Sequence, residues 1–224
     1  MSTTQWKGKF INVNLSQIKI ILKKIKAKKT EKKHLHKYVI FVFPEYRDRR
    51  QVRIKKSSEH VTLSIYKDDL ETNEYRLDIY VRVSSYDKTI DFLQKMGMVN
   101  KRHREYYRST WTWKGVKVQF YTYPGLPTFI RVVATDHNMA KKLLKQLELQ
   151  FNNAIYYETE VMYAKMFDTT PDKVLDLKEI RFDNIDNIGT YFVREAKRDE
   201  YKFQKKTRRR RDFEGRLLVK KNEK

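Results

Sequence analysis

Basic side chains recur at alternating positions in segments whose pattern is typical of β-strands. Arg53 and Lys55 stand two residues apart, and so do Arg102 and Arg104. Successive side chains of a strand point to opposite faces, so each pair shares one face of its strand. Arginine offers a planar fork of donors and lysine a point charge, a combination that suits a chain of phosphates. Such faces could equally point outward into solvent, and alternation alone does not choose between the two arrangements.

The whole chain is strongly basic. It has 224 residues, with 50 Lys+Arg against 28 Asp+Glu, and a formal net charge of +22. So much positive charge repels itself unless it meets negative charge. The sequence therefore predicts a polyanionic partner, for which the candidates are nucleic acid, a nucleotide or other phosphate-rich small molecule, polyphosphate, and an anionic membrane surface. A merely solubilising surface is the alternative.

A series of strands with a few helices must position these side chains. Alternating or short apolar runs predict eight strands, at residues 10–15, 38–43, 52–56, 61–67, 75–84, 101–113, 116–122 and 129–134. Helical spacing predicts helices after Ser16 and at residues 85–97, 136–149, 158–167 and 171–177. The short connections favour antiparallel pairing, with a hairpin turning at Lys114-Gly115. We therefore predict an α+β fold, an eight-stranded antiparallel β-tunnel or barrel with flanking helices.

A sheet that curls into a tunnel turns one face of every strand toward its interior. Cations on that face would line a cavity, where only water or an anion could compensate their lost hydration.

Short motifs follow one another over residues 9–188. They are Val52-Arg53-Ile54-Lys55, Lys67 at a strand end, Arg76-Leu77-Asp78, Arg102-His103-Arg104-Glu105-Tyr106-Tyr107, and Pro124-Gly125-Leu126-Pro127-Thr128-Phe129. In order and spacing they resemble the CYTH, or triphosphate tunnel metalloenzyme, superfamily. That superfamily includes class IV adenylate cyclases, thiamine triphosphatases and RNA triphosphatases. The resemblance implies a triphosphate tunnel whose phosphate contacts are Arg53, Lys55, Lys67, Arg76, Arg102 and Arg104.

Most acids that would hold Mg²⁺ or Mn²⁺ in this superfamily are missing from the matching positions. Asn12, Asn14 and Ser16 stand where the first strand would carry Glu-x-Glu-x-Lys, and the other positions hold Tyr80, Tyr121, Arg131 and Val133. Of the acidic set only Asp78 remains. A hard divalent cation needs several oxygen ligands with net negative charge. We therefore expect no metal site, no cofactor and no catalytic residue.

The resulting prediction is a domain that binds a nucleotide, polyphosphate or RNA 5′ end without metal-dependent catalysis. One alternative is a residual triphosphatase or adenylate cyclase-like enzyme, which would require Mg²⁺ or Mn²⁺. Another is a basic scaffold whose outer surface binds nucleic acid.

Residues 189–224 form a basic C-terminal extension that ends its densest stretch in four consecutive arginines, Arg208, Arg209, Arg210 and Arg211. This run predicts contact with RNA or DNA, and a solvated tail is the alternative. The chain has no Cys and no apolar stretch long enough to span a membrane, so we expect an intracellular protein, cytoplasmic or nuclear.

Two further groups are expected to be structurally unremarkable. His34-x-His36 is interpreted as part of a solvated loop, and not as a metal site. Glu158 and Glu160 are two residues apart on a predicted helix, where their side chains diverge on the surface.

Overall fold

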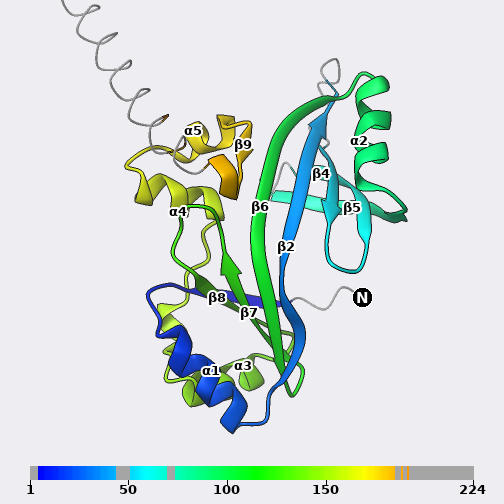
Figure 1. Ribbon diagram of the computed structural model, residues 1–224. Helices are drawn as coiled ribbons and strands as arrows, with labels where there is room; N and C mark the ends of the chain where they lie inside the picture. Colours follow the sequence, from blue (N-terminus) through cyan, green and yellow to red (C-terminus); the bar gives the residue numbers. More distant parts are fainter. Residues whose placement is uncertain (1–4, 44–50, 70–73, 185–187, 189–190, 192–224) are drawn as a thin grey trace, which may run out of the picture.

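The computed structural model describes residues 5–43, 51–69, 74–184, 188 and 191, with backbone alone at 67–69 and 74–78. A single sheet organises the chain (Figure 1). Its strands lie in the order β1 (Trp6–Phe10), β8 (Phe129–Ala134), β7 (Val116–Thr122), β6 (Val99–Trp113), β2 (Lys28–Val42), β3 (Gln51–Lys56), β4 (Val61–Asp69) and β5 (Glu74–Val83). A short ninth strand, β9 (Glu179–Ile180), pairs with β6 in parallel.

Every pairing along the eight-strand path is antiparallel. The described parts of β1 and β5, at the two ends of this order, do not pair with each other, so the sheet stays open. The predicted α+β fold with eight antiparallel strands is confirmed, in a tunnel-like form that does not close into a barrel.

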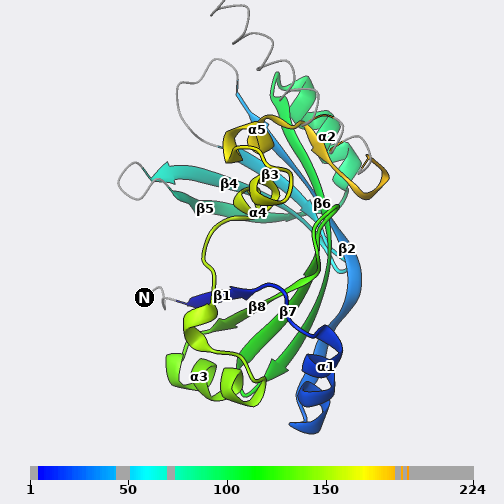
Figure 2. The same cartoon turned by 90° about the vertical axis from the view of Figure 1, so that its left-hand side faces the viewer.

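The long strands β2 and β6 run the length of the molecule, and the shorter strands extend from them in two groups. In Figure 2, β1, β8 and β7 extend to the same side of the β2–β6 pair as β3, β4 and β5. The sheet therefore has a concave face on that side. The helices α4 (Thr159–Met166) and α5 (Pro171–Asp176) border the concavity.

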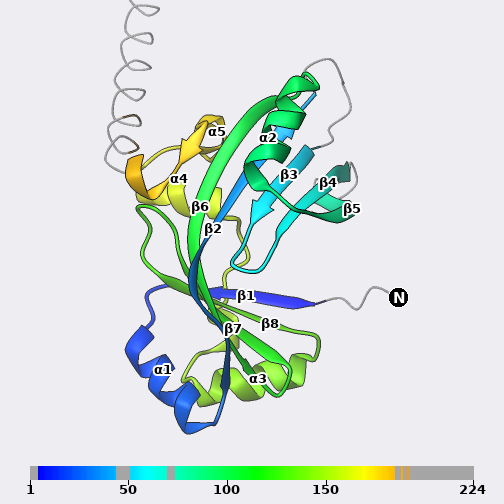
Figure 3. The ribbon, with the colours of Figure 1, turned by 45° about the vertical axis from the view of Figure 1, so that its right-hand side comes forward.

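Three apolar clusters hold the layers together. The helices α1 (Leu15–Lys24) and α3 (His137–Gln146) pack on β1, β7 and β8 at one end, through side chains such as Leu22, Leu143 and Val132. The helix α2 (Tyr86–Lys95) covers the outer face of β2 and β3 at the other end (Figure 3). A third cluster joins α4, α5 and β9 to β6, β7 and β8. No helix within these described residues is long and apolar enough to cross a membrane.

The observed elements follow the sequence pattern closely after residue 51. The hairpin turns at Lys114 and Gly115, whose φ angles are 45° and 81°, and Gly97 ends the α2 region with a φ of 83°. These left-handed conformations suit glycine, which has no Cβ to clash. Ser85 and Asp136 cap α2 and α3 by accepting hydrogen bonds from main-chain amides.

The N-terminal predictions were wrong. The first strand is Trp6–Phe10, not residues 10–15, and Asn14 rather than Ser16 caps the following helix. Asn12, Asn14 and Ser16 therefore do not lie on the first strand. That strand carries Lys7 and Lys9 and still no acid. The lysine-rich residues 28–37 belong to β2, because antiparallel pairing with β6 outweighs their weak strand pattern.

Gly8 is a point where packing admits no side chain. A Cβ there would lie 2.6 Å from two ring atoms of Trp6 and 3.0 Å from the Cβ of Ala154. The Trp6 ring cannot easily move, because it stacks on Phe151 with ring centroids 4.8 Å apart. We expect Gly8→Ala to lower the free energy of unfolding by about 1–3 kcal/mol through overpacking. Lys7→Ala, at an exposed neighbour, should change it little, and equal chemical-denaturation midpoints for the two variants would contradict this packing.

Candidate functional site

The concave face contains a cavity of about 310 Å³. It is lined by side chains from β1, β2, β3, β6, β7 and β8 and by residues of α4, α5 and β9. Six cations border it: Lys9, Arg53, Lys55, Arg104, Arg108 and Arg131. Two acids, Glu158 and Glu160, lie at its α4 side.

Strand register explains why these residues meet. Lys9 pairs with Arg131, Arg131 with Gln119, and Gln119 with Thr110, so one row crosses β1, β8, β7 and β6. A second row joins Arg104, Tyr38 and Lys55 across β6, β2 and β3. Directly opposite residues of neighbouring strands project to the same side of a sheet. The concave face is therefore basic along both rows.

Arg53 and Lys55 reach the cavity from β3, as the alternation predicted. The Arg53 guanidinium lies over the rings of Tyr38 and Tyr66, at 5.1 and 4.5 Å from their centroids, and its buried Nε has no hydrogen-bond partner. Burial lowers the pKa of Lys55, and the positive charge of Arg108 lowers it further. Within the part of the chain that the structure describes, no carboxylate lies within ion-pair distance of either residue.

Arg131 is held from β8 by neutral groups. Its Nε and Nη2 donate to Gln119 Oε1 at 3.1 and 2.9 Å, and Nη2 also donates to the Tyr121 hydroxyl at 2.5 Å. None of its described partners carries a negative charge, so its full charge remains available to the cavity. In the sequence, Arg131 and Tyr121 stand out only as replacements for acids, whereas in the structure both line the cavity.

Unlike the three cations above, Lys9 and Arg108 each have an acidic neighbour. Lys9 Nζ donates to the carbonyl of Tyr157 at 2.5 Å and lies 3.6 Å from Glu158. Burial lowers the pKa of Lys9, and Glu158 partly offsets that effect. Arg108 forms a two-pronged pair with Glu31, at 2.8 Å from Nε and 2.7 Å from Nη2.

Arg102 and Arg104, the two phosphate contacts predicted on β6, donate hydrogen bonds to main-chain carbonyls. Arg104 borders the cavity, but its Nη atoms donate to the carbonyls of Val174, Leu177 and Lys178 at 2.8–3.3 Å. Arg102 donates from Nε to the carbonyl of Leu175 at 2.9 Å and is absent from the cavity lining. Both anchor the segment from α5 to β9 against the sheet.

The remaining predicted contacts lie partly or wholly outside the described residues. The backbones of Lys67 and Arg76 are paired on β4 and β5, while their side chains, and that of Asp78, are outside the description. The arginine run from 208 to 211 lies outside it altogether.

Aromatic side chains make up much of the remaining wall. Tyr106 is at the centre, with ring centroids 5.4 Å from Tyr121 and 5.1 Å from Tyr123. Tyr121 and Tyr123 in turn stack near Phe129, at 5.6 and 5.9 Å. Burial raises the pKa of Tyr38 to about 12, so its hydroxyl stays neutral. The wall thus adds no negative charge to offset the cations.

Two interpretations of the sequence need correction. His34 and His36 lie on β2, not in a solvated loop, and His36 is 0 % exposed. Glu158 is on the surface as expected, with its side chain 82% exposed, but both it and Glu160 also border the cavity. Neither position was visible in the local pattern, because strand pairing buries His36 and the docking of α4 places the two acids at the rim of the cavity.

Comparison of the sequence with models of known families finds no match, and neither does comparison with curated proteins. Solved structures do share the fold. A proposed adenylate cyclase from Vibrio parahaemolyticus is similar with a TM-score of 0.56 and 10% identity, covering 71% of this chain and 97% of that one. The PH1012 protein from Pyrococcus horikoshii OT3 has a TM-score of 0.51 and 14% identity, and the match covers 68% of this chain and 94% of that one. A conserved hypothetical protein from Pyrococcus furiosus has a TM-score of 0.51 and 15% identity, with 70% of this chain and 98% of that one covered.

At sequence identities of 10–15%, the similarity to these structures shows a shared fold and nothing more. The chain has a CYTH-type fold, as the resemblance of its motifs implied.

The uncompensated charge of Lys55 leads to a prediction about stability. Replacing a buried ion that has no acidic partner by an apolar side chain of similar length removes a desolvation penalty. We expect Lys55→Met to stabilise the ligand-free protein by about 1 kcal/mol, which raises the melting temperature by about 2–4 °C. Lys101→Met, at an exposed position of β6, is the matched control. A lower melting temperature for Lys55→Met alone would mean that Lys55 is satisfied in the empty cavity.

Proposed function

We propose that this protein binds a chain of phosphates, as polyphosphate or the triphosphate of a nucleotide, in the cavity of its concave face. The observation that carries this proposal is the convergence of Arg53, Lys55 and Arg131 with no described carboxylate within ion-pair distance of them. Partly buried cations without acidic partners are costly, and a multivalent anion reduces that cost. A phosphate chain carries several negative charges along its length and can contact cations from different strands at once, whereas a single phosphate offers fewer contacts.

The same cavity is poorly suited to the Mg²⁺ or Mn²⁺ that the superfamily resemblance implies. Strands β1, β7 and β8 present Lys9, Tyr121 and Arg131 to it, and none of these is an oxyanion ligand. Of the two nearby acids, Glu158 lies 3.6 Å from the Lys9 ammonium. A hard cation requires several oxygen ligands with net negative charge. The proposed function is therefore binding without metal-dependent hydrolysis or cyclisation.

Isothermal titration with tripolyphosphate and with orthophosphate, both in excess chelator, tests the proposal. We expect tripolyphosphate to bind more tightly at equal total phosphate. Arg53→Met should weaken it roughly 10- to 150-fold, the effect of losing one hydrogen-bonded charge contact of about 1.5–3 kcal/mol. Lys95→Met, at an exposed position of α2 on the outer side of the sheet, should leave the affinity unchanged. Equal affinities for the two anions would contradict a site for a phosphate chain.

A hydrolysis assay on the same protein distinguishes the enzymatic alternative. We expect no release of phosphate from tripolyphosphate or ATP with Mg²⁺ or Mn²⁺ present. Steady turnover in the wild type that disappears in Arg53→Met would establish an active triphosphatase instead.

Binding of nucleic acid by the C-terminal extension is a separate prediction. Replacing Arg208 to Arg211 by glutamine should weaken binding to long RNA or DNA. It should also reduce the slope of log affinity against log salt by up to about 3–4, since each phosphate contact contributes about 0.7–0.9. Tripolyphosphate affinity should not change. An unchanged salt slope would show that these arginines do not contact the polymer.

A further inference from the structure

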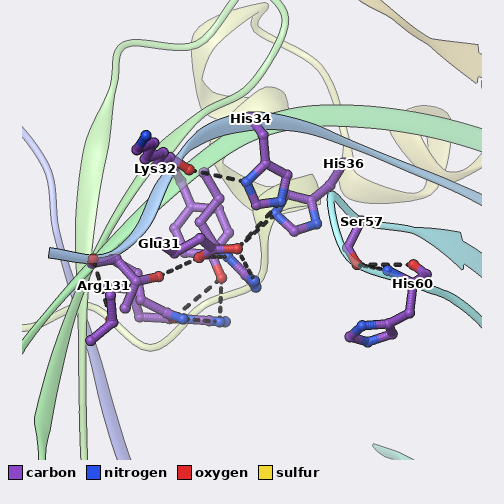
Figure 4. A network of polar contacts seen from close by, with 12 residues as sticks. Glu31, Lys32, His34, His36, Ser57, His60 and Arg131 are labelled. Atoms are coloured by element: carbon purple, nitrogen blue, oxygen red, sulfur yellow. Dashed lines mark hydrogen bonds and ion pairs between the residues drawn. The ribbon is translucent and has the colours of Figure 1, made fainter.

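A cluster of metal-ligating side chains lies on β2. Glu31, His34 and His36 each offer a ligand atom, and the three atoms lie within 4.8 Å of one another. Glu31 Oε1 is 3.3 Å from His34 Nε2 and 3.4 Å from His36 Nε2 (Figure 4). None of these residues has a part in the proposed phosphate site.

A β-bulge creates the cluster. In a regular strand, Glu31 would point away from His34 and His36, because side chains alternate faces. Here Glu31 pairs with Thr110 and His34 pairs with Arg108, so three steps on β2 match two steps on β6. The extra residue turns Glu31 to the face of the two histidines, and bulges commonly re-aim a side chain in this way.

The ligand atoms are oriented by a second layer of contacts. His34 Nδ1 lies 3.0 Å from the carbonyl of Lys32, so the proton on Nδ1 leaves the Nε2 lone pair facing Glu31. Arg108 and Thr110 both donate to the Glu31 carboxylate. His36 stacks on Tyr106 with ring centroids 4.8 Å apart and an interplanar angle of 10°. Such outer contacts typically fix the ligands of a metal.

The buried histidine nitrogens that face Glu31 lack hydrogen-bond partners. Neither ring nitrogen of His36 has a hydrogen bond, and His34 Nε2 has none either. His36 is fully buried, so no solvent replaces the missing partners. Buried polar atoms without partners commonly mark an ion or a water that completes the site.

We propose that Glu31, His34 and His36 bind a divalent transition metal of the Zn²⁺ type. Tetrahedral zinc with bonds of 2.0–2.1 Å separates its ligand atoms by about 3.3–3.4 Å, which matches both measured distances. Two imidazoles and one carboxylate form a three-ligand set that leaves a fourth position for water or an anion. The nitrogen ligands select zinc, cobalt or copper over Mg²⁺ and Ca²⁺.

A second cavity lies beside the cluster, on the Glu31 side. Glu31 and Arg108 line this cavity of about 390 Å³, together with Thr110, Lys55 and residues 57–60. The positive charge of Arg108 opposes cation binding, but Arg108 and Thr110 also hold the Glu31 carboxylate in place through their hydrogen bonds.

Titration of the chelator-treated full chain with Co²⁺ tests the proposal, because tetrahedral cobalt absorbs strongly in the visible range. We expect one equivalent to bind with a tetrahedral spectrum and Zn²⁺ to displace it. His36→Phe, which keeps the stack on Tyr106, and His34→Gln should each abolish the tetrahedral spectrum or weaken binding at least tenfold. The control His137→Gln, at an exposed position of α3, should behave as wild type.

X-ray absorption of the Zn²⁺-loaded wild type supplies a measurement that does not depend on the variants folding. Scattering from two imidazoles would support the site. Absence of stoichiometric Co²⁺ binding, an octahedral spectrum, or zinc without imidazole neighbours would overturn it. The phosphate proposal is tested in chelator, so either proposal can fail without the other.

Discussion

The antiparallel pairing of β2 with β6 is the constraint on which the rest of this structure depends. The two strands each span 15 residues, and the other sheet strands extend from one or other of them. Their register sets which side chains face the concavity, and their bulges alter it locally. Because the period of a strand is two, a shift of one residue would send Arg104, Tyr106 and Arg108 to the outer face. The basic cavity is thus a consequence of register.

The charge on the concave face conflicts with stability of the empty protein. Arg53, Lys55 and Arg131 stand in a wall of tyrosines, and the described groups that accept hydrogen bonds from Arg131 are an amide and a hydroxyl. Such an arrangement stores electrostatic repulsion that a bound anion would relieve, and anion binding would then be linked to folding. Where acids do reach the interior, they neutralise a particular cation, as Glu31 does for Arg108.

The concave face therefore contains two chemically different environments that share an edge. The β1, β8 and β3 side is cationic and suits phosphate oxygens, whereas the Glu31, His34 and His36 group suits a borderline metal. Arg108 and Lys55 line both cavities. Arg104 borders the cationic cavity, but its guanidinium donates hydrogen bonds to main-chain carbonyls and so holds the α5–β9 segment against the sheet.

The amino-acid sequence by itself determined the elements with a strong local signal. Clean alternation and turn residues located β3 to β8, and capping side chains located α2 and α3, because these preferences act between near neighbours. Motif order also indicated the CYTH-type fold, and the alternation on β3 placed Arg53 and Lys55 on one face. What the tertiary structure alone decided depends on contacts between distant residues. Pairing with β6 made residues 28–37 a strand, cross-strand register brought Lys9 and Arg131 together, and a bulge turned Glu31 toward His34 and His36. No local pattern encodes these outcomes, since each requires a partner strand that lies far away in the chain.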